Sequence, residues 1–435
     1  MGGPTREQQN CILMFVFVAC QRVKPSSVAS KPHLLFLTPV TPADTGSGLA
    51  MRAGIVVRAL ADWYRISLLI VPFYDGRPRE APAAIARLCH QTVVLPLDPG
   101  GQTPSVASLL QGQDEGEGSA SSFWRAAIEK AQCALQNLPF DVIHVFRLVM
   151  VPFAEPYLSS SRRRSMKCHL DLDIIESKTR RRLAELYRAT GKSTEARVEA
   201  LLARRFEALE EEAFARFDRV YVCSEQDKEE LQGRSRAKVS VLPNAVHAPG
   251  PVPPTAVEGP FAFMFIGTLS YYPNEDALNY FCEDIAPLIR QAAPGDFRLH
   301  VVGRGMSDAT RRLSQVPEVR ILGEAAEVAP LYRDADAVIV PLRAAGGTRI
   351  KILEAFSYRC PVVTTSIGLE GIEARDAEHV LVADTAQTFA SHCLHLMTDR
   401  GSAERMAERA FALFMGAYSF HAVQRAIQPQ PALCE

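Results

Sequence analysis

Short apolar runs alternate with amphipathic segments along most of the chain from residue 33 onward. The run His33–Thr38 ends in a turn rich in proline and glycine, which is typical of a buried parallel strand. Residues 48–64 carry apolar side chains at helical spacing and are predicted to form a helix. Strands that alternate with helices build a parallel sheet covered on both faces. The other strands expected in this half are 66–72, 92–96, 141–145, 219–224 and 239–243, with a charged helix at 197–217.

A proline-rich segment then interrupts the alternation. Residues 245–260 contain five prolines and two glycines, too many for a helix or strand to continue. After it the alternation restarts, with strands expected at 261–267, 298–303, 319–323, 337–341, 361–365 and 380–383 and helices at 276–290 and 348–358.

This repetition predicts an α/β protein with two Rossmann-like lobes whose parallel sheets face each other across a cleft. Ligands of such sheets bind beyond the carboxyl ends of the strands, so the cleft is the expected site. The predicted boundaries are an N-terminal extension at 1–32, a first lobe at 33–246, a linker at 247–260, a second lobe at 261–415 and a C-terminal segment at 416–435 that packs back on the first lobe.

The amino-acid composition argues against several classes of protein. The 48 Lys and Arg balance 49 Asp and Glu, so no overall basic field attracts nucleic acid. The longest apolar run, residues 11–20, is half of the ~20 residues that cross a bilayer. It lies in an extension interpreted as outside the fold, and a short signal segment is the alternative. The ten cysteines form no C-x-x-C pair, which argues against a zinc ribbon and predicts a reducing, cytoplasmic location.

The most informative chemistry lies where a buried strand is followed by a glycine loop and a helix. Gly346 and Gly347 allow the backbone to approach a ligand, and Thr348 is predicted to cap the helix. Arg349 and Lys351 then place two cations in the first turn, where they oppose the helix dipole unless an anion offsets them. The pattern therefore predicts an anion site, most plausibly for a diphosphate.

Glu354 follows Lys351 by three residues, so the two side chains share a face of the helix. A carboxylate one turn from a phosphate suits a ribose diol, which it can bind as an acceptor of two hydrogen bonds. The alternative is a solvated helix that carries an ordinary ion pair.

Several short motifs occur in one order along the chain: DRVYVCS at 218–224, VLPN at 241–244, FIG at 265–267, VGRG at 302–305, GGTRIKILEA at 346–355 and the segment 361–371. In this order they resemble the retaining glycosyltransferases of the GT-B fold, in the sucrose-synthase-like group called family 4 or glycosyltransferase group 1. The resemblance implies transfer of a sugar from a nucleotide-diphospho-sugar, held by the second lobe, to an acceptor hydroxyl held by the first. The acceptor would be a polysaccharide, a lipid-linked glycan or a natural product, and no metal or other cofactor is expected. A sugar-nucleotide epimerase and a catalytically silent scaffold are the alternatives.

The resemblance also assigns residues in the second lobe. Glu354 fits the second acid of the family's Glu-x7-Glu pair, and Gly346 stands where the first acid is usual. The family's Gly-Arg and the Lys that follows are replaced by Gly267-Thr268 and, further on, by Asn274. Arg349 and Lys351 would supply the missing positive charge to the leaving diphosphate. Gly303 and Arg304 complete the donor-binding residues that the family implies.

In the first lobe, Gly46 and Gly48 resemble the family's glycine loop facing the donor, and a plain tight turn is the alternative. His169 and Asp171 resemble the family's loop that contacts the transferred sugar. A structural role is the alternative, and with Asp173 the D-x-D pattern also admits a metal site.

Two basic runs, Arg162–Arg164 and Arg180–Arg182, are either solvated helix faces or a contact with an anionic membrane surface at the inner face. The segment 189–194 mimics the end of a phosphate-binding P-loop. It has no strand before it and is interpreted as a decoy.

Overall fold

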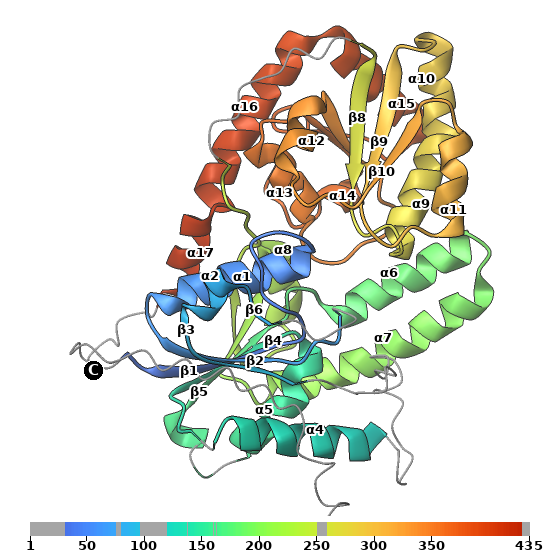
Figure 1. Cartoon of the computed structure of the whole chain (residues 1–435). Helices are drawn as coiled ribbons and strands as arrows, with labels where there is room; N and C mark the ends of the chain where they lie inside the picture. Colours follow the sequence, from blue (N-terminus) through green and yellow to red (C-terminus); the bar gives the residue numbers. More distant parts are fainter. Residues whose placement is uncertain are drawn as a thin grey trace, which may run out of the picture.

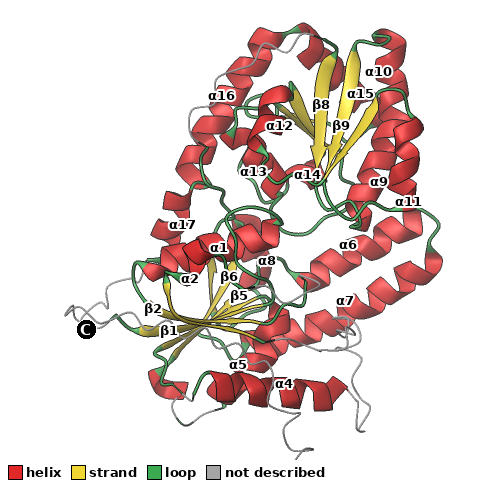
Figure 2. Ribbon diagram, in the orientation of Figure 1, coloured by secondary structure: helices red, strands yellow, loops and turns green. Residues whose placement is uncertain are grey.

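The computed structural model describes residues 31–74, 80–95, 120–136, 138–159, 161, 163–249 and 259–428. They form two α/β domains, stacked one above the other in Figure 1, each with a parallel sheet between layers of helices (Figures 1 and 2). The expected architecture of two Rossmann-like lobes is thereby confirmed. Most of the predicted N-terminal extension, part of the linker and the last seven residues lie outside the described ranges.

The sheet of the first domain has strand order β3-β2-β1-β4-β5-β6-β7, and every neighbouring pair is parallel. In β1, Leu34 and Phe36 pack into one face of the sheet and Leu35 and Leu37 into the other, all fully buried. Burial on both faces explains why the strand reads as a continuous apolar run. The bounds are β1 His33–Thr38, β2 Arg65–Ile70, β3 Cys89–Val94, β4 Val142–Phe146, β5 Lys167–Asp171, β6 Arg219–Val222 and β7 Lys238–Val241.

The helices of this domain cover both faces of its sheet (Figure 2). Ser47 caps α1, because its hydroxyl oxygen accepts from the backbone N–H of Ala50. A helix was expected before the segment 189–194 without stated bounds; it is α6, which pairs closely with α7 in an antiparallel hairpin. The bounds are α1 Gly48–Ala61, α2 Ala83–Ala86, α4 Ala120–Ala134, α5 Val151–Leu158, α6 Glu176–Ala189, α7 Ser193–Phe214 and α8 Glu225–Gln232.

The sheet of the second domain has strand order β10-β9-β8-β11-β12-β13, again parallel throughout. Its central strands are fully apolar, as the run FAFMFI of β8 illustrates. The bounds are β8 Phe261–Ile266, β9 Phe297–Val302, β10 Val319–Gly323, β11 Ala337–Val340, β12 Val362–Thr364 and β13 Leu381–Val382.

One predicted helix of the second domain is interrupted. A π turn at Phe281–Ile285 separates α9 from α10, where a single helix over 276–290 was expected. The bounds are α9 Tyr272–Tyr280, α10 Ala286–Ala292, α11 Asp308–Arg312, α12 Ala329–Asp334, α13 Ile350–Ser357, α14 Ser366–Leu369, α15 Ala386–Thr398 and α16 Arg400–Ala417.

The chain passes between the domains at two adjacent places. Val246, on the way to the second domain, forms a β-bridge with Ser419, on the way back. The last helix, α17 (Phe420–Ile427), then packs on α1 of the first domain, where Val423 is fully buried (Figure 1).

The α6–α7 hairpin reaches the second domain on the other side. The ring of Tyr187 stacks on that of Tyr272, with 4.3 Å between their centres, and the amine of Lys192 lies 4.0 Å from the Tyr272 ring. The P-loop-like segment is the turn of this hairpin, between two helices. Its lysine contacts an aromatic ring of the other domain, in agreement with the interpretation as a decoy.

Candidate functional site

Lys351 lies among the carboxyl ends of the second domain's strands. Its amine donates to Asn274 Oδ1 over 3.0 Å and lies 4.2 Å from the centre of the Phe265 ring. Asn274 donates in turn to the carbonyl oxygen of Thr268 over 2.9 Å. A Cβ added at Gly267 would come within 3.0 Å of the amine. Four residues predicted from the sequence, Gly267, Thr268, Asn274 and Lys351, therefore meet at one place.

Lys351 and Glu354 lie one turn apart near the start of α13, and the pKa values of both side chains are strongly shifted. Burial and the nearby charge of Arg349 lower the pKa of Lys351 to about 7. Burial raises the pKa of Glu354 to about 7, and its carboxylate accepts a hydrogen bond from the Tyr332 hydroxyl over 3.2 Å. A cation and a carboxylate on one helix face, both titrating near neutral pH, can bind a ligand that offers an anion next to hydroxyl groups.

The start of α13 differs from the expectation. The helix begins at Ile350, and Arg349 rather than Thr348 occupies the capping position, because the extended backbone continues one residue further (φ −82°, ψ 96°). The Thr348 hydroxyl is buried without a hydrogen-bond partner. The Arg349 guanidinium donates to the carbonyl oxygens of Gly347 and Ile367. Arg349 therefore bonds to the backbone of Gly347 and Ile367, whereas Lys351 bonds to Asn274 of α9.

The two glycines before α13 lie against the first domain. A Cβ at Gly346 would overlap with the hydroxyl of Thr179 in α6, and one at Gly347 would come 2.5 Å from Cγ2 of Ile174. The sequence suggested close approach to a phosphate, whereas the structure shows close approach to α6. The place of the family's first acid is therefore occupied by a side chain of the other domain.

The glycine loop of the first domain faces the start of α13. A Cβ at Gly48 would come 2.9 Å from Cγ1 of Ile350, the first residue of that helix, and Gly46 has a left-handed backbone with φ of 108°. The loop predicted to face a donor and the helix predicted to bind its diphosphate are thus in contact across the domain boundary.

Gly303, at the end of β9, lies directly beside the loop after β8. Its φ is 149°, and a Cβ there would overlap with the carbonyl oxygen of Gly267. The carbonyl of Arg304 accepts from the N–H of Leu269 over 2.8 Å, while the Arg304 side chain is exposed. The two strand ends can approach this closely only with a glycine at position 303.

His169 and Asp171 lie inside the first domain, on β5, and not at the domain boundary as expected. Asp171 is fully buried and accepts a hydrogen bond from Arg52 Nη2 over 2.7 Å. The His169 ring lies edge-on to Tyr221, and burial lowers its pKa to about 3. A carboxylate held by a buried arginine and a neutral imidazole within a sheet favour the structural role that was the alternative for these two residues.

A group that the sequence did not reveal lies nearby, where β4 and β5 end. Arg147 donates to Asp173 over 3.0 Å and to Glu176 over 2.5 Å. Arg147 and Asp173 both have left-handed backbones, with φ of 73° and 57°. Strained backbone of this kind clusters at functional sites. No local pattern in the sequence predicts it, because the three residues meet only through the order of the strands.

The arginines predicted as a basic surface are largely engaged within the molecule. Arg180 bonds to Glu199, Arg181 to Ser177 and Arg182 to Glu370, while Arg163 bonds to Asp218. Arg162 lies outside the described residues. The run Arg180–Arg182 therefore supports α6 and its contact with the second domain and is not a free cationic surface.

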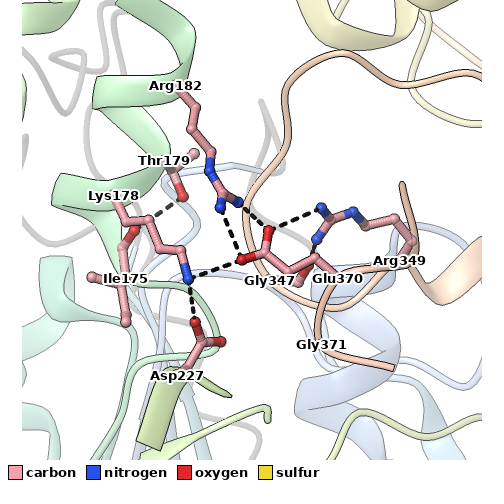
Figure 3. Close-up of a pocket in the computed structure, with 9 residues that line it drawn as sticks. All are labelled: Ile175, Lys178, Thr179, Arg182, Asp227, Gly347, Arg349, Glu370 and Gly371. Carbon is pink, nitrogen blue, oxygen red and sulfur yellow. Dashed lines mark hydrogen bonds and ion pairs between the residues drawn. The ribbon is translucent and has the colours of Figure 1, made fainter. Parts of the chain in front are cut away.

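Glu370 is the centre of that contact (Figure 3). It accepts from Arg182 Nη2 over 2.8 Å and lies 3.1 Å from the amine of Lys178, both on α6. Those two cations lower the pKa of Glu370 to about 2. Arg349 Nη2 lies 3.8 Å from the same carboxylate, and the small pocket between these side chains has room for about one water molecule.

The described part of the chain contains neither a group of metal ligands nor a membrane-spanning helix. No three His, Cys, Asp or Glu residues there are grouped as metal ligands, and Asp171 and Asp173 are instead paired with arginines. No helix there is both long and apolar enough to span a bilayer.

Comparison with known proteins gives a family match for part of the chain. Residues 260–399 match the family model described as Glycosyl transferases group 1. A curated relative, an uncharacterized 44.6 kDa protein in the cps region of Klebsiella pneumoniae, is 22% identical over 163 residues. That match covers 36% of this chain and 42% of the relative, so the chain spans less than half of the length of this relative.

Solved structures match over nearly the whole chain. Sucrose-phosphate synthase from Thermosynechococcus elongatus has a TM-score of 0.67 at 14% identity, covering 90% of this chain and 96% of its own. HepE from Anabaena, in complex with UDP and glucose, has a TM-score of 0.57 at 15% identity, covering 91% and 97%. The trehalose-6-phosphate synthase OtsA has a TM-score of 0.60 at 12% identity, covering 90% and 97%. These likenesses confirm the GT-B fold expected from the motifs.

Proposed function

We propose that the protein is a retaining glycosyltransferase that uses a nucleotide-diphospho-sugar, because residues 260–399 match the model of group 1 glycosyl transferases and the chain has a GT-B fold. The proposal depends on two side chains near the start of α13. There the Lys351 amine and the Glu354 carboxylate lie one helical turn apart, opposite the glycine loop of the first domain.

The donor would bind with its diphosphate at Lys351 and its ribose at Glu354. Lys351 would supply positive charge at the loop of Gly267 and Thr268, where the family resemblance expects cations that this sequence lacks. A buried ammonium without an anionic ligand is costly, and a diphosphate offsets that cost. The HepE structure, which contains UDP and glucose, supports a donor of this class.

Transfer would follow from charge stabilisation. Departure of the diphosphate develops negative charge at the helix start, where the free N–H groups and Lys351 stabilise it. Attack from the same face as the leaving group lets its phosphate oxygen take the proton of the acceptor hydroxyl. This route gives retention without a protein nucleophile and without a metal. Closure of the two domains would exclude water, which otherwise hydrolyses the donor.

The acceptor would bind on the first domain, beside the ion pairs of Arg147 with Asp173 and Glu176. The left-handed backbones of Arg147 and Asp173 mark the ends of β4 and β5. The match to a protein of a cps region supports a polysaccharide or lipid-linked glycan as its class. We also propose a cytoplasmic location, because the seven cysteines within the described ranges are all free thiols.

The test is a thermal-shift and turnover panel of nucleotide sugars, beginning with UDP-glucose. A ligand at a hundred times its dissociation constant stabilises a protein by about 2.7 kcal/mol, which is readily measured as a rise in Tm. Release of UDP that depends on added acceptor supports a transferase. Conversion of the donor sugar without an acceptor would indicate an epimerase, and binding without turnover would indicate a scaffold.

A further inference from the structure

Glu370 joins three cations that come from both domains. Lys178 and Arg182 reach it from successive turns of α6, and Arg349 lies on its other side, at the residue before α13 (Figure 3). Its carboxylate has a side-chain exposure of only 14%. Ion pairs shielded from water in this way contribute more than surface pairs do.

The loop that carries Glu370 is shaped to reach α6. Gly371 follows with φ of 77°, and a Cβ there would lie 3.4 Å from Cβ of Ser224 in the first domain. On the other side of the same contact, Arg182 Nη1 donates to the carbonyl of Ala345 over 3.1 Å, just before the two glycines that touch Thr179 and Ile174. One face of α6 therefore contacts two loops of the second domain, residues 345–347 and residues 370–371. Both loops lie beside the start of α13.

From this geometry we infer that Glu370 is a positioning residue: it fastens α6 to the second domain and thereby fixes the start of α13 against the first domain. The inference rests on the proposed function for its consequence in catalysis, whereas the fastening itself is independent of it. Glu370 acts through Arg349 and the 345–349 loop and is not placed in contact with the donor.

The charges around the contact indicate that its loss would separate the domains without unfolding α6. Lys178 keeps two further partners in the first domain, Asp227 and Glu230, each at 2.9 Å. Arg349 keeps its bonds to the carbonyls of Gly347 and Ile367. Without Glu370, three cations would remain near one another across the boundary, and their mutual repulsion would favour opening.

The variant Glu370→Gln tests this by removing the charge and keeping the shape. In the full chain without ligand, we expect faster amide hydrogen exchange in residues 174–182 and 345–350 and a larger radius of gyration in small-angle scattering. With UDP-glucose as donor, we expect kcat to fall by about a hundredfold, the scale on which a displaced active-site group slows reaction. The KM for the donor should change far less, because Lys351 and Glu354 are unaltered.

Two further variants separate this role from a general loss of stability. Arg182→Gln should reproduce the effect from the other domain. The double variant should change exchange and kcat by less than the sum of the two single variants, since both remove the Arg182–Glu370 pair. Glu318→Gln is the matched control, because Glu318 also holds an arginine through two hydrogen bonds, of 2.6 and 2.8 Å to Arg290, within the second domain.

Exchange in Glu370→Gln that equals that of Glu318→Gln would overturn the inference, as would full additivity with Arg182→Gln. If the wild-type chain turns over no nucleotide sugar, the proposed function fails. The exchange measurement then still decides the fastening role, because it needs no substrate.

Discussion

Donor affinity should depend on pH through Lys351 and Glu354, which lie one turn apart near the start of α13. In the donor-free protein, burial and the charge of Arg349 lower the pKa of Lys351 to about 7. A bound diphosphate favours the ammonium form and raises this pKa, so binding takes up a proton at higher pH. The contribution of Lys351 to affinity is then full below pH 7 and falls by up to tenfold for each pH unit above it. At about pH 8 this loss approaches 1.4 kcal/mol.

Glu354 should lower donor affinity on the acid side of the pH profile. Burial raises its pKa to about 7, and only the ionised form accepts two hydrogen bonds from a ribose diol. Below pH 7 the carboxyl must lose its proton for the donor to bind, so affinity also falls on the acid side. Among the described residues, the groups that face this pair include Arg349, Asn274, Tyr332, Tyr358 and the Phe265 ring, and of these Arg349 is charged at neutral pH. We therefore expect a bell-shaped profile with its maximum near neutral pH.

Isothermal titration calorimetry with UDP-glucose between about pH 5.5 and about pH 8.5 measures this profile. UDP-glucose is preferable to UDP, whose terminal phosphate itself titrates near pH 6. Lys351→Met should abolish the alkaline limb and keep the acid limb, shifted to higher pH because the ammonium that lowers the pKa of Glu354 is gone. Glu354→Gln should abolish the acid limb. A flat wild-type profile, or an alkaline limb that survives in Lys351→Met, would refute the assignment.

Two further substitutions test the corrected parts of the site. Gly346→Ala places a Cβ where the Thr179 hydroxyl lies, so we expect kcat to fall at least tenfold. Adding Thr179→Ala should restore part of kcat in the double variant. An unchanged kcat in Gly346→Ala would mean that the domains need not approach so closely. Asp171→Asn removes the nearest carboxylate partner of the buried Arg52, at 2.7 Å, and leaves the longer contact of 3.6 Å with Asp173. This should lower the free energy of unfolding by about 3 kcal/mol in urea titrations while the kcat of the folded protein is retained. A large loss of kcat without a loss of stability would return Asp171 to the catalytic site.

Much of the fold could be predicted because both sheets are parallel and buried on both faces. A strand such as β8, with the sequence FAFMFI, has no polar position and ends at a glycine, so its place is evident from the sequence. The strand β5 was missed because its sequence, KCHLD, mixes polar and apolar residues. Its polar side chains are satisfied by buried partners such as Arg52, which come from distant parts of the chain.

The site was predictable where the side chains that form it lie on one element or follow one strand. Lys351 and Glu354 are one turn apart on α13, and the Gly267 loop follows β8 directly. The role of Gly346 and Gly347 was not predictable, because a glycine that admits a ligand and one that admits another helix look alike in a sequence. The same holds for Glu370, whose partners Lys178 and Arg182 lie nearly two hundred residues away.

A structure of the chain with UDP-glucose tests the central claim most directly. The account predicts diphosphate oxygens within hydrogen-bond distance of Lys351 Nζ and the ribose hydroxyls at Glu354, with Gly48 and Ile350 still close together. A nucleotide bound away from the start of α13, for example in the pocket lined by Ser224 and Tyr418, would contradict the account.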